Sequence, residues 1–326
     1  MARNFWQQLD TPFTVLAPME DVTDFVFREI IAQTAPPNVF FTEFTNVAGL
    51  MSEGRKVVAQ RLKFSEKQRP IVAQIWGTDP KNYYEGAKLV AEMGFDGVDI
   101  NMGCPQRNVV KQGAGAGLIE TPKLAAEIIE STKEGVLAAE GAEKIPVSVK
   151  TRLGFKKIIT KEWAEFLLKQ DIAALTMHGR TQGQMSKVPA NWDEIKKVVK
   201  ARDEIAPETV IIGNGDVADH KEAVKKAKKY GVDGVMIGRG IFTNPWAFEK
   251  APIEHTPKEH LDLLLKHTKL FVDTWETKKN FAIMKKFFKV YVRGFEGAST
   301  LRAGLMGCES LEEVETIVEK FMNKNF

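Results

Sequence analysis

The sequence predicts a (β/α)8 TIM barrel followed by a small all-helical C-terminal domain. Short runs of apolar and β-branched residues recur up to Ile237, amphipathic segments separate them, and this alternation stops after Phe248. Short strands that are apolar on both faces, each followed by a helix, are typical of a parallel sheet. Eight such units fit a closed barrel better than an open doubly wound sheet.

The strands and helices are assigned from these two patterns. The predicted strands are Thr14–Ala17, Val39–Thr42, Ile71–Ile75, Gly97–Ile100, Val147–Lys150, Ala174–Met177, Val210–Ile212 and Gly234–Ile237. The amphipathic segments predicted as helices are Tyr83–Met93, Leu124–Ala138, Lys161–Lys169, Trp192–Arg202 and Lys221–Tyr230. The second unit is irregular, so its helix is the least defined.

The C-terminal part of the chain follows a linker. Residues 251–257 contain two prolines, which discourage helix continuation. Helical periodicity then predicts a helix from Lys258, a second over Phe281–Arg293 and a last over Leu311–Phe321. We expect residues 1–250 to form the barrel domain and residues 258–326 the helical domain.

Composition narrows the class of protein. Hydrophobic residues make up 44% of the 326 residues, and the formal charge of +3 allows a polyanionic partner without requiring one. Two cysteines give no disulfide framework, so a reducing cytoplasm is expected. The sequence shows no secretory signal pattern and no apolar stretch long enough to span a membrane.

Side chains capable of chemistry collect at the predicted strand ends, where the active sites of TIM barrels lie. In chain order these residues are Glu20, Gln74, Asp99, Asn101, Cys104, Lys150, Arg152, His178, Arg180, Asn214, Asp216 and Arg239. A purely structural barrel does not need this concentration on one face.

Cys104 is the most informative of these residues. It lies on a turn between Gly103 and Pro105, directly after the fourth predicted strand. From the residues alone it could be a nucleophile, a metal ligand or a structural thiol. A metal site is not expected, because no spacing of the five histidines closes one with the two cysteines. Cys308 has no basic neighbours and is expected to have no chemical role.

The last two strand ends have the features of a phosphate site. Gly215 and Gly238 let backbone N–H groups approach an anion, Arg239 adds charge, and a short helix beginning near Ile241 would add its positive end. The alternative is that these glycines only permit tight turns. Residues 113–117, which alternate glycine and alanine, follow no strand and are predicted to be a flexible loop.

Five further strand-end residues could contribute to a site, and for three of them a second interpretation is open. Lys150 would either meet an electron-rich partner in the barrel mouth or extend to solvent. His178 could be catalytic or structural, and Gln74 could bind a ligand or be a satisfied core amide. Asn101 and Arg152 offer an amide and a fork of donors that suit the polar edge of a pyrimidine.

Taken together, these residues resemble the tRNA-dihydrouridine synthases, flavin enzymes built on a TIM barrel with a helical C-terminal domain. The matching stretches appear in family order. They are residues 16–19, 22–24, 72–74, 99–105, 147–152, 178–181, 214–216 and 235–239. Glu20 and Asp21 depart from the commonest family pattern, in which small residues are frequent at these positions. This departure concerns the subtype within the family and not the activity.

The resemblance implies a cofactor and a reaction. FMN would lie across the barrel mouth, with its ring near Pro18 and Met19, with Gln74 and Lys150 at its polar edge and with His178 nearby. Glu20 would also belong to the cofactor-binding residues. Asn214, Gly215, Asp216, Gly238 and Arg239 would hold its phosphate. NADPH would reduce the flavin, hydride would pass from N5 to C6 of a uridine in tRNA, and Cys104 would protonate C5. A thiol with a reference pKa near 8.5 suits the role of acid at neutral pH. Asn101 and Arg152 would contact the substrate.

The helical domain is expected to bind the RNA. Residues 278–293 contain no acid and six basic residues, which are Lys278, Lys279, Lys285, Lys286, Lys289 and Arg293. Of these, we assign Lys285, Lys286, Lys289 and Arg293 to the substrate. The alternative for this segment is a solvated basic face. The resemblance also implies a monomer.

Two other functions compete with this one. A flavin barrel acting on a free small molecule, such as a dihydroorotate or dihydropyrimidine oxidoreductase, would not need the basic helix or the appended domain. A non-catalytic RNA-binding protein would not need Cys104, Lys150 and His178. The sequence does not identify the tRNA position.

Overall fold

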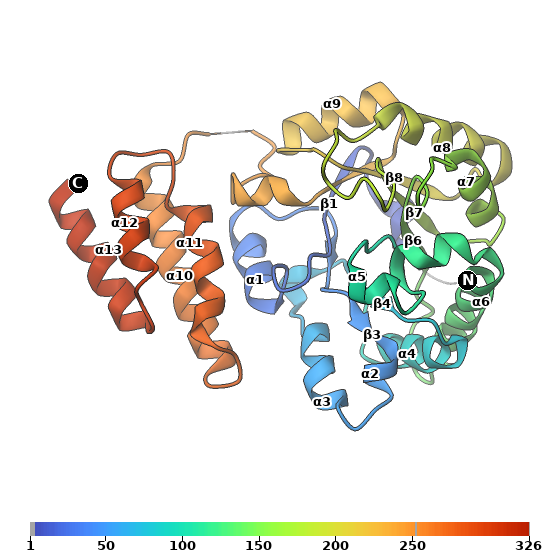
Figure 1. The fold of residues 1–326 in the computed structure, drawn as a ribbon, viewed down its shortest axis with the longest axis horizontal. Helices are drawn as coiled ribbons and strands as arrows, with labels where there is room; N and C mark the ends of the chain where they lie inside the picture. The colour runs from blue at the N-terminus through green and yellow to red at the C-terminus, as the bar shows by residue number, and fades with distance from the viewer. Residues whose placement is uncertain (1–3, 252, 326) are drawn as a thin grey trace.

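The computed structural model describes residues 4–251 and 253–325, and its strands form a parallel barrel (Figure 1). The strand order is β1-β9-β8-β7-β6-β5-β4-β2, with β3 also paired to β4. A parallel bridge between Val15 and Val39 joins the two ends of this order and closes the ring. The predicted TIM barrel is confirmed.

The strands agree with the predicted ones except in the second unit. Their bounds are β1 Phe13–Leu16, β2 Phe40–Phe41, β3 Thr45–Asn46, β4 Ile71–Trp76, β5 Gly97–Met102, β6 Val147–Arg152, β7 Ala174–His178, β8 Val210–Asn214 and β9 Gly234–Ile237. The predicted second strand, Val39–Thr42, is reduced to the two residues of β2, and β3 was not predicted; both pair with β4.

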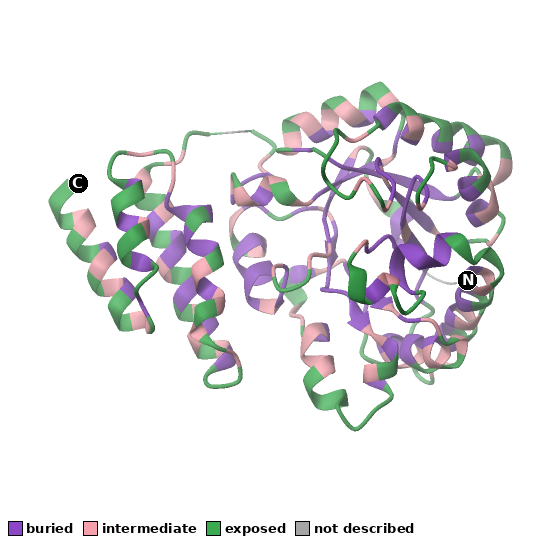
Figure 2. Cartoon of the chain, viewed as in Figure 1, coloured by how far each residue is buried: buried purple, intermediate pink, exposed green. Residues whose placement is uncertain are grey.

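The helices around the barrel include the five predicted ones. Their bounds are α1 Phe25–Thr34, α4 Pro80–Glu92, α6 Pro122–Leu137, α7 Thr160–Leu168, α8 Trp192–Ile205 and α9 His220–Tyr230. The second unit has only the short helices α2 Val47–Leu50 and α3 Arg55–Val58, which explains why its helical pattern was weak. Figure 2 shows buried residues on the strands and on the helix faces turned toward them.

The two-residue period of the strands explains where the polar side chains lie. On β9, Val235 and Ile237 pack outward against the helices, while Met236 packs into the barrel with Phe13 and Ile212. Residues two positions further along a strand occupy the same inner face. The inner face therefore changes from apolar near the start of the strands to polar at their carboxyl ends, for example from Ile212 to Asn214 on β8.

Four helices follow the barrel, at the left of Figure 1: α10 Pro257–Trp275, α11 Lys285–Tyr291, α12 Ala298–Leu305 and α13 Leu311–Asn325. The predicted helix over Phe281–Arg293 is wrong in part, because residues 281–284 form a 3-10 turn before α11. α12 was not predicted. Pro257 begins α10 at a position that tolerates proline, and Thr256 caps it. The other linker proline, Pro252, lies outside the described residues.

An aromatic contact joins these helices to the barrel. Phe27 of α1 stacks on Phe287 of α11 with ring centroids 5.3 Å apart, and His267 of α10 lies 5.7 Å from Phe27. All three side chains are buried. The helical region therefore packs against the barrel through an apolar interface on α1, the helix that follows the carboxyl end of β1.

Candidate active site

A cavity of about 770 Å³ opens at the carboxyl ends of the strands. Its volume is within the range of a cofactor or small-ligand pocket. Most of the predicted site residues line it: Pro18, Met19, Glu20, Gln74, Asn101, Cys104, Lys150, Arg152, His178, Asn214, Gly215, Asp216, Gly238 and Arg239. Lys285, Lys286, Lys289 and Arg293 do not line it.

The turn that carries Cys104 is fixed by four hydrogen bonds. The Asn101 Oδ1 accepts from the backbone N–H groups of Gly103 at 3.1 Å and Cys104 at 2.9 Å. Arg152 Nε donates to the Gly103 carbonyl at 2.6 Å, and Ala116 N donates to the Cys104 carbonyl at 3.0 Å. Cys104 is 8% exposed, and burial raises the pKa of its thiol. The site therefore holds a protonated thiol at the wall of the cavity.

The segment after Cys104 is packed, and the prediction of a flexible loop at residues 113–117 is wrong. Residues 115–120 form a 3-10 helix, and residues 114–119 are buried. Gly115 has φ +58°, and a Cβ there would lie 2.8 Å from the Cys104 carbonyl oxygen. The glycine is needed because the backbone of this segment lies directly against the cysteine turn. No signal local to the sequence reveals this contact.

A chain of polar groups leads from the Cys104 turn into the barrel. Asn101 Nδ2 donates to Gln74 Oε1 at 2.8 Å, and Gln74 Nε2 donates to Asp99 at 2.7 Å. Ser148 Oγ donates to the other oxygen of Asp99 at 2.6 Å. Burial raises the pKa of Asp99 to about 6. Since a carboxylate only accepts, Asp99 fixes which way both amides point, and so directs Asn101 Oδ1 toward the turn.

Lys150 and Arg152 point into the mouth from β6. The Lys150 Nζ donates to Asn214 Oδ1 at 3.2 Å, and burial followed by repulsion from Arg152 lowers the lysine pKa to about 8. Besides Gly103, Arg152 donates to the carbonyls of Thr181 and Met185, both at 3.2 Å, and burial lowers its pKa to about 10. Arg152 therefore holds the cysteine turn, a role that its strand-end position alone did not indicate.

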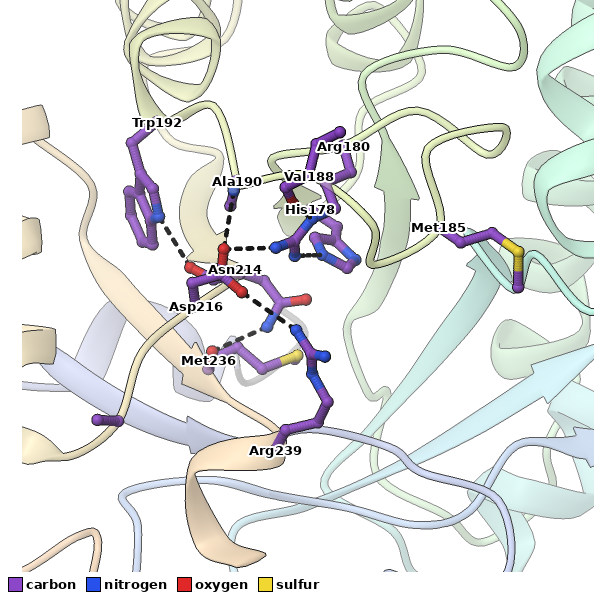
Figure 3. A network of polar contacts seen from close by, with 12 residues as sticks. His178, Arg180, Met185, Val188, Ala190, Trp192, Asn214, Asp216, Met236 and Arg239 are labelled. Atoms are coloured by element: carbon purple, nitrogen blue, oxygen red, sulfur yellow. Dashed lines mark hydrogen bonds and ion pairs between the residues drawn. The ribbon is translucent and has the colours of Figure 1, made fainter. Parts of the chain in front are cut away.

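Asp216 is the centre of a polar network across the strand ends (Figure 3). It pairs with Arg180, lies 3.1 Å from Arg239 and accepts from the Ala190 N–H at 2.8 Å. Its φ is +49°, an uncommon conformation that the network holds in place. No role was predicted for Arg180 from the sequence. Its side chain is buried, and it orients both Asp216 and His178.

His178 is uncharged in this setting. Arg180 Nη1 lies 3.1 Å from His178 Nε2, and because a guanidinium only donates, this nitrogen accepts. Burial and then the charges of Arg152, Lys150, Arg180 and Arg239 hold the His178 pKa well below its usual value. The same cations give this wall of the cavity a positive potential suited to an anionic ligand.

The two predicted phosphate turns differ in how strictly they need glycine. Gly215 has φ +126°, and a Cβ there would lie 2.7 Å from the Ala190 Cβ. A Cβ at Gly238 would lie 3.5 Å from Ala17 Cβ, an ordinary contact. Gly240 was not predicted, yet a Cβ there would lie 2.5 Å from the Ala218 carbonyl oxygen.

The loop after β1 carries the residues that depart from the commonest family pattern. Glu20 pairs with Arg61 at 2.9 Å, and Asp21 N donates to Glu43 at 2.7 Å. Thr23 Oγ1 accepts from Met19 N at 2.9 Å. Glu20 therefore lines the cavity with its charge already paired.

The basic C-terminal segment partly contacts the barrel. Lys279 pairs with Asp24 at 3.0 Å, Lys286 donates to the Asp21 carbonyl, and Arg293 donates to the Phe242 carbonyl at 3.1 Å. The absence of acids within residues 278–293 therefore does not leave Lys279 unpaired, and two of the four residues assigned to the substrate, Lys286 and Arg293, lie at the interface with the barrel. Lys289 is exposed and Lys285 is half-buried.

The described part of the chain contains neither a candidate membrane span nor a candidate metal cluster. No helix among residues 4–251 and 253–325 is long and apolar enough to cross a membrane. Within the same residues, no cluster of three or more His, Cys, Asp or Glu side chains could hold a metal ion.

Comparison with known proteins identifies the family. The family model described as dihydrouridine synthase (Dus) matches residues 15–326. A "Probable tRNA-dihydrouridine synthase" of Staphylococcus aureus (strain COL) is 51% identical over 324 residues, which cover 98% of this chain and 96% of the relative. A "Probable tRNA-dihydrouridine synthase 2" of Bacillus subtilis (strain 168) is 49% identical and covers 99% of this chain and 98% of the relative.

Among solved structures, DHODH in complex with ferulenol from Eimeria tenella is 14% identical with a TM-score of 0.49, covering 69% of this chain and 75% of that one. The fold assignment rests on the strand order and not on this likeness. Because the family model spans nearly the whole chain and two relatives are about half identical over nearly their full lengths, the chain belongs to the dihydrouridine synthase family.

Proposed function

We propose that this protein reduces the C5–C6 double bond of a uridine in tRNA, with FMN as cofactor and NADPH as the reductant. The observation that carries the proposal is the buried, protonated thiol of Cys104 on the wall of a cavity that is positively charged and large enough for a flavin. The names of the relatives support tRNA as the substrate. A cytoplasmic monomer stays a prediction.

The cavity fits FMN by the chemistry of its donors. Lys150 and Arg239 can face electron-rich or anionic groups, and burial together with the surrounding cations keeps His178 neutral. The Asn214–Asp216 and Gly238–Arg239 turns would hold the phosphate, with Arg239 the most accessible cation of the network. Pro18 and Met19 would lie against the ring, and Gln74 and Lys150 at its polar edge.

The chain's own residues would handle the proton. Bound in reduced form, FMN would supply the hydride that C6 of the uracil accepts. The Cys104 S–H bond would break as its proton forms the new C–H bond at C5, so that one hydride and one proton saturate the double bond. Arg152 and Lys150 stabilise the thiolate that remains, since both favour the charged form of Cys104. Solvent would then return the proton to the sulfur.

Asn101 and Arg152 would orient the uracil, and the existing hydrogen bonds of Asn101 restrict which of its groups can contact the substrate. The Asn101 Oδ1 already accepts two backbone hydrogen bonds, and one Nδ2 hydrogen is donated to Gln74. Only the second Nδ2 hydrogen remains for a uracil oxygen. We therefore expect Asn101 to donate to the substrate and not to accept from it.

The test is a reaction with defined components. Purified protein should be yellow and should release FMN on denaturation. With NADPH and an unmodified tRNA transcript, it should produce dihydrouridine, detected in nucleoside digests by mass spectrometry. A colourless protein that FMN cannot reconstitute would contradict the flavin assignment. A flavoprotein that reduces free pyrimidines but not tRNA would contradict the substrate assignment.

A further inference from the structure

Three neighbouring loops at the cavity mouth contain no acidic residue. They are residues 103–119 after β5, 152–161 at the end of β6 and 178–192 at the end of β7, and we call them together the basic rim. The chain has 43 acidic residues, so their absence here is a marked local bias. The basic residues of the rim are Arg107, Lys111, Arg152, Lys156, Lys157, Lys161, Arg180 and Lys187.

Hydrogen bonds join the three loops into one wall. Gln182 N donates to the Gly154 carbonyl at 2.9 Å and Gly183 N donates to the Phe155 carbonyl at 3.1 Å, which ties the second loop to the third. Gln182 Nε2 donates to the Pro105 carbonyl at 3.3 Å and so reaches the first loop. The basic rim is therefore a single surface, because its three loops are joined to one another by these hydrogen bonds.

Six of its cations are exposed. Lys161 pairs with Glu165 at 3.8 Å, and the other five are Arg107, Lys111, Lys156, Lys157 and Lys187. None of the five has an ion pair or a side-chain hydrogen bond to another described residue, unlike Lys279 and Lys286 of the C-terminal segment. Apolar side chains lie between them, with Ile158 44% exposed and Met185 and Val188 each 39% exposed. Unpaired cations interspersed with apolar groups are suited to phosphates and the faces of ribose or bases.

The opposite side of the mouth has a different charge. Glu20 and Asp216 line the cavity from the loops after β1 and β8, and Glu222 from the first turn of α9; each of the three pairs with a cation. A polyanion approaching the mouth therefore meets unpaired cations on the basic rim, whereas on the opposite side acidic residues lie among the cations. Gln106, Met185 and Ser186 belong to both the basic rim and the cavity wall, so the rim begins where the cavity ends.

We propose that the basic rim is an RNA-contacting surface of this enzyme, separate from the C-terminal helices, which holds the phosphates next to the target uridine. The inference rests on the proposed tRNA substrate. A nucleotide extruded into the cavity brings its flanking phosphates to the mouth. The rim presents its unpaired cations at that point, whereas part of the basic C-terminal segment contacts the barrel.

The test compares two double variants. Lys156→Gln/Lys157→Gln removes two rim charges, and Lys225→Gln/Lys228→Gln removes two equally exposed charges from α9. Binding of an unmodified tRNA transcript is measured by filter binding across a range of salt concentrations. At about 0.1 M salt each phosphate contact contributes about five- to eight-fold to affinity, so loss of two should weaken binding about 25- to 60-fold and reduce the log–log salt slope by about 1.4–1.8.

The α9 variant should bind like wild type, and both variants should keep the wild-type melting temperature. Equal binding by the rim and α9 variants, whether both unchanged or both weakened, would overturn the role of the rim. Failure of the wild-type protein to bind tRNA at all would instead overturn the proposed substrate, and the inference with it.

Discussion

Gly115→Ala tests whether the segment after Cys104 supports the cysteine turn. Alanine at φ +58° costs about 1–2 kcal/mol of backbone strain. Its Cβ would also lie 2.8 Å from the Cys104 carbonyl oxygen and 2.9 Å from Val109 Cγ1, overpacking that costs about 1–3 kcal/mol. The expected total is about 2–5 kcal/mol. With an unfolding entropy of about 0.7 kcal/mol/K for a chain of this length, the melting temperature should fall by about 3–7 °C.

Gly113→Ala is the matched control. Gly113 has φ +79°, but a Cβ there would have its nearest contact at 3.8 Å, so only the strain remains. Calorimetry should show a decrease of about 1.5–3 °C for this variant. Dihydrouridine formation should fall in Gly115→Ala, because the turn must shift away from the added methyl group, and should be retained in Gly113→Ala. Equal melting temperatures and equal activities in the two variants would refute the supporting role.

Three further predictions address the cofactor, the RNA and the interface. Lys150 has a pKa of about 8 before an anionic ligand raises it, so the affinity for FMN should be highest below pH 8 and should fall about tenfold per pH unit above it. The Lys150→Met variant should bind FMN more weakly, and its affinity should not show this fall. Fluorescence titration at several pH values measures both affinities. Lys285→Ala/Lys289→Ala should weaken tRNA binding in a filter assay without changing the melting temperature; unchanged affinity would move the RNA surface away from α11. Phe287→Ala removes the stacking partner of Phe27 and should cost about 3–5 kcal/mol of stability, measured by urea unfolding; a cost below about 1 kcal/mol would mean that the interface does not stabilise the fold.

The strand ends could be predicted from the sequence because they follow from local rules. A parallel barrel brings the carboxyl ends of all its strands to one mouth, and the two-residue period decides which side chains point inward. Gln74, Lys150 and Asn214 could therefore be placed together without a structure. The sequence did not show that Gln74 and Asn101 orient each other through Asp99, because amide orientation depends on partners from several strands.

Contacts between distant segments account for the other differences. Lys279 and Asp24 are separated by 255 positions. The sequence around Lys279 contains no acid, and its acidic partner could not be identified because that partner lies on the barrel. In the same way, residues 113–117 have a composition typical of a flexible loop, and only their contact with Cys104 makes them a packed support. α12 was not predicted because the helix is short, the surrounding residues 294–306 contain glycines, and its stability depends on packing against α13.

The role of Cys104 as the proton donor is tested most directly by the rate of dihydrouridine formation in Cys104→Ala. The variant should bind FMN and tRNA as the wild type does, since the turn is held through backbone groups and the Asn101 and Arg152 side chains. Loss of a positioned general acid should lower the single-turnover rate on tRNA by about 10²–10⁴-fold. A variant that forms dihydrouridine at the wild-type rate would contradict the account.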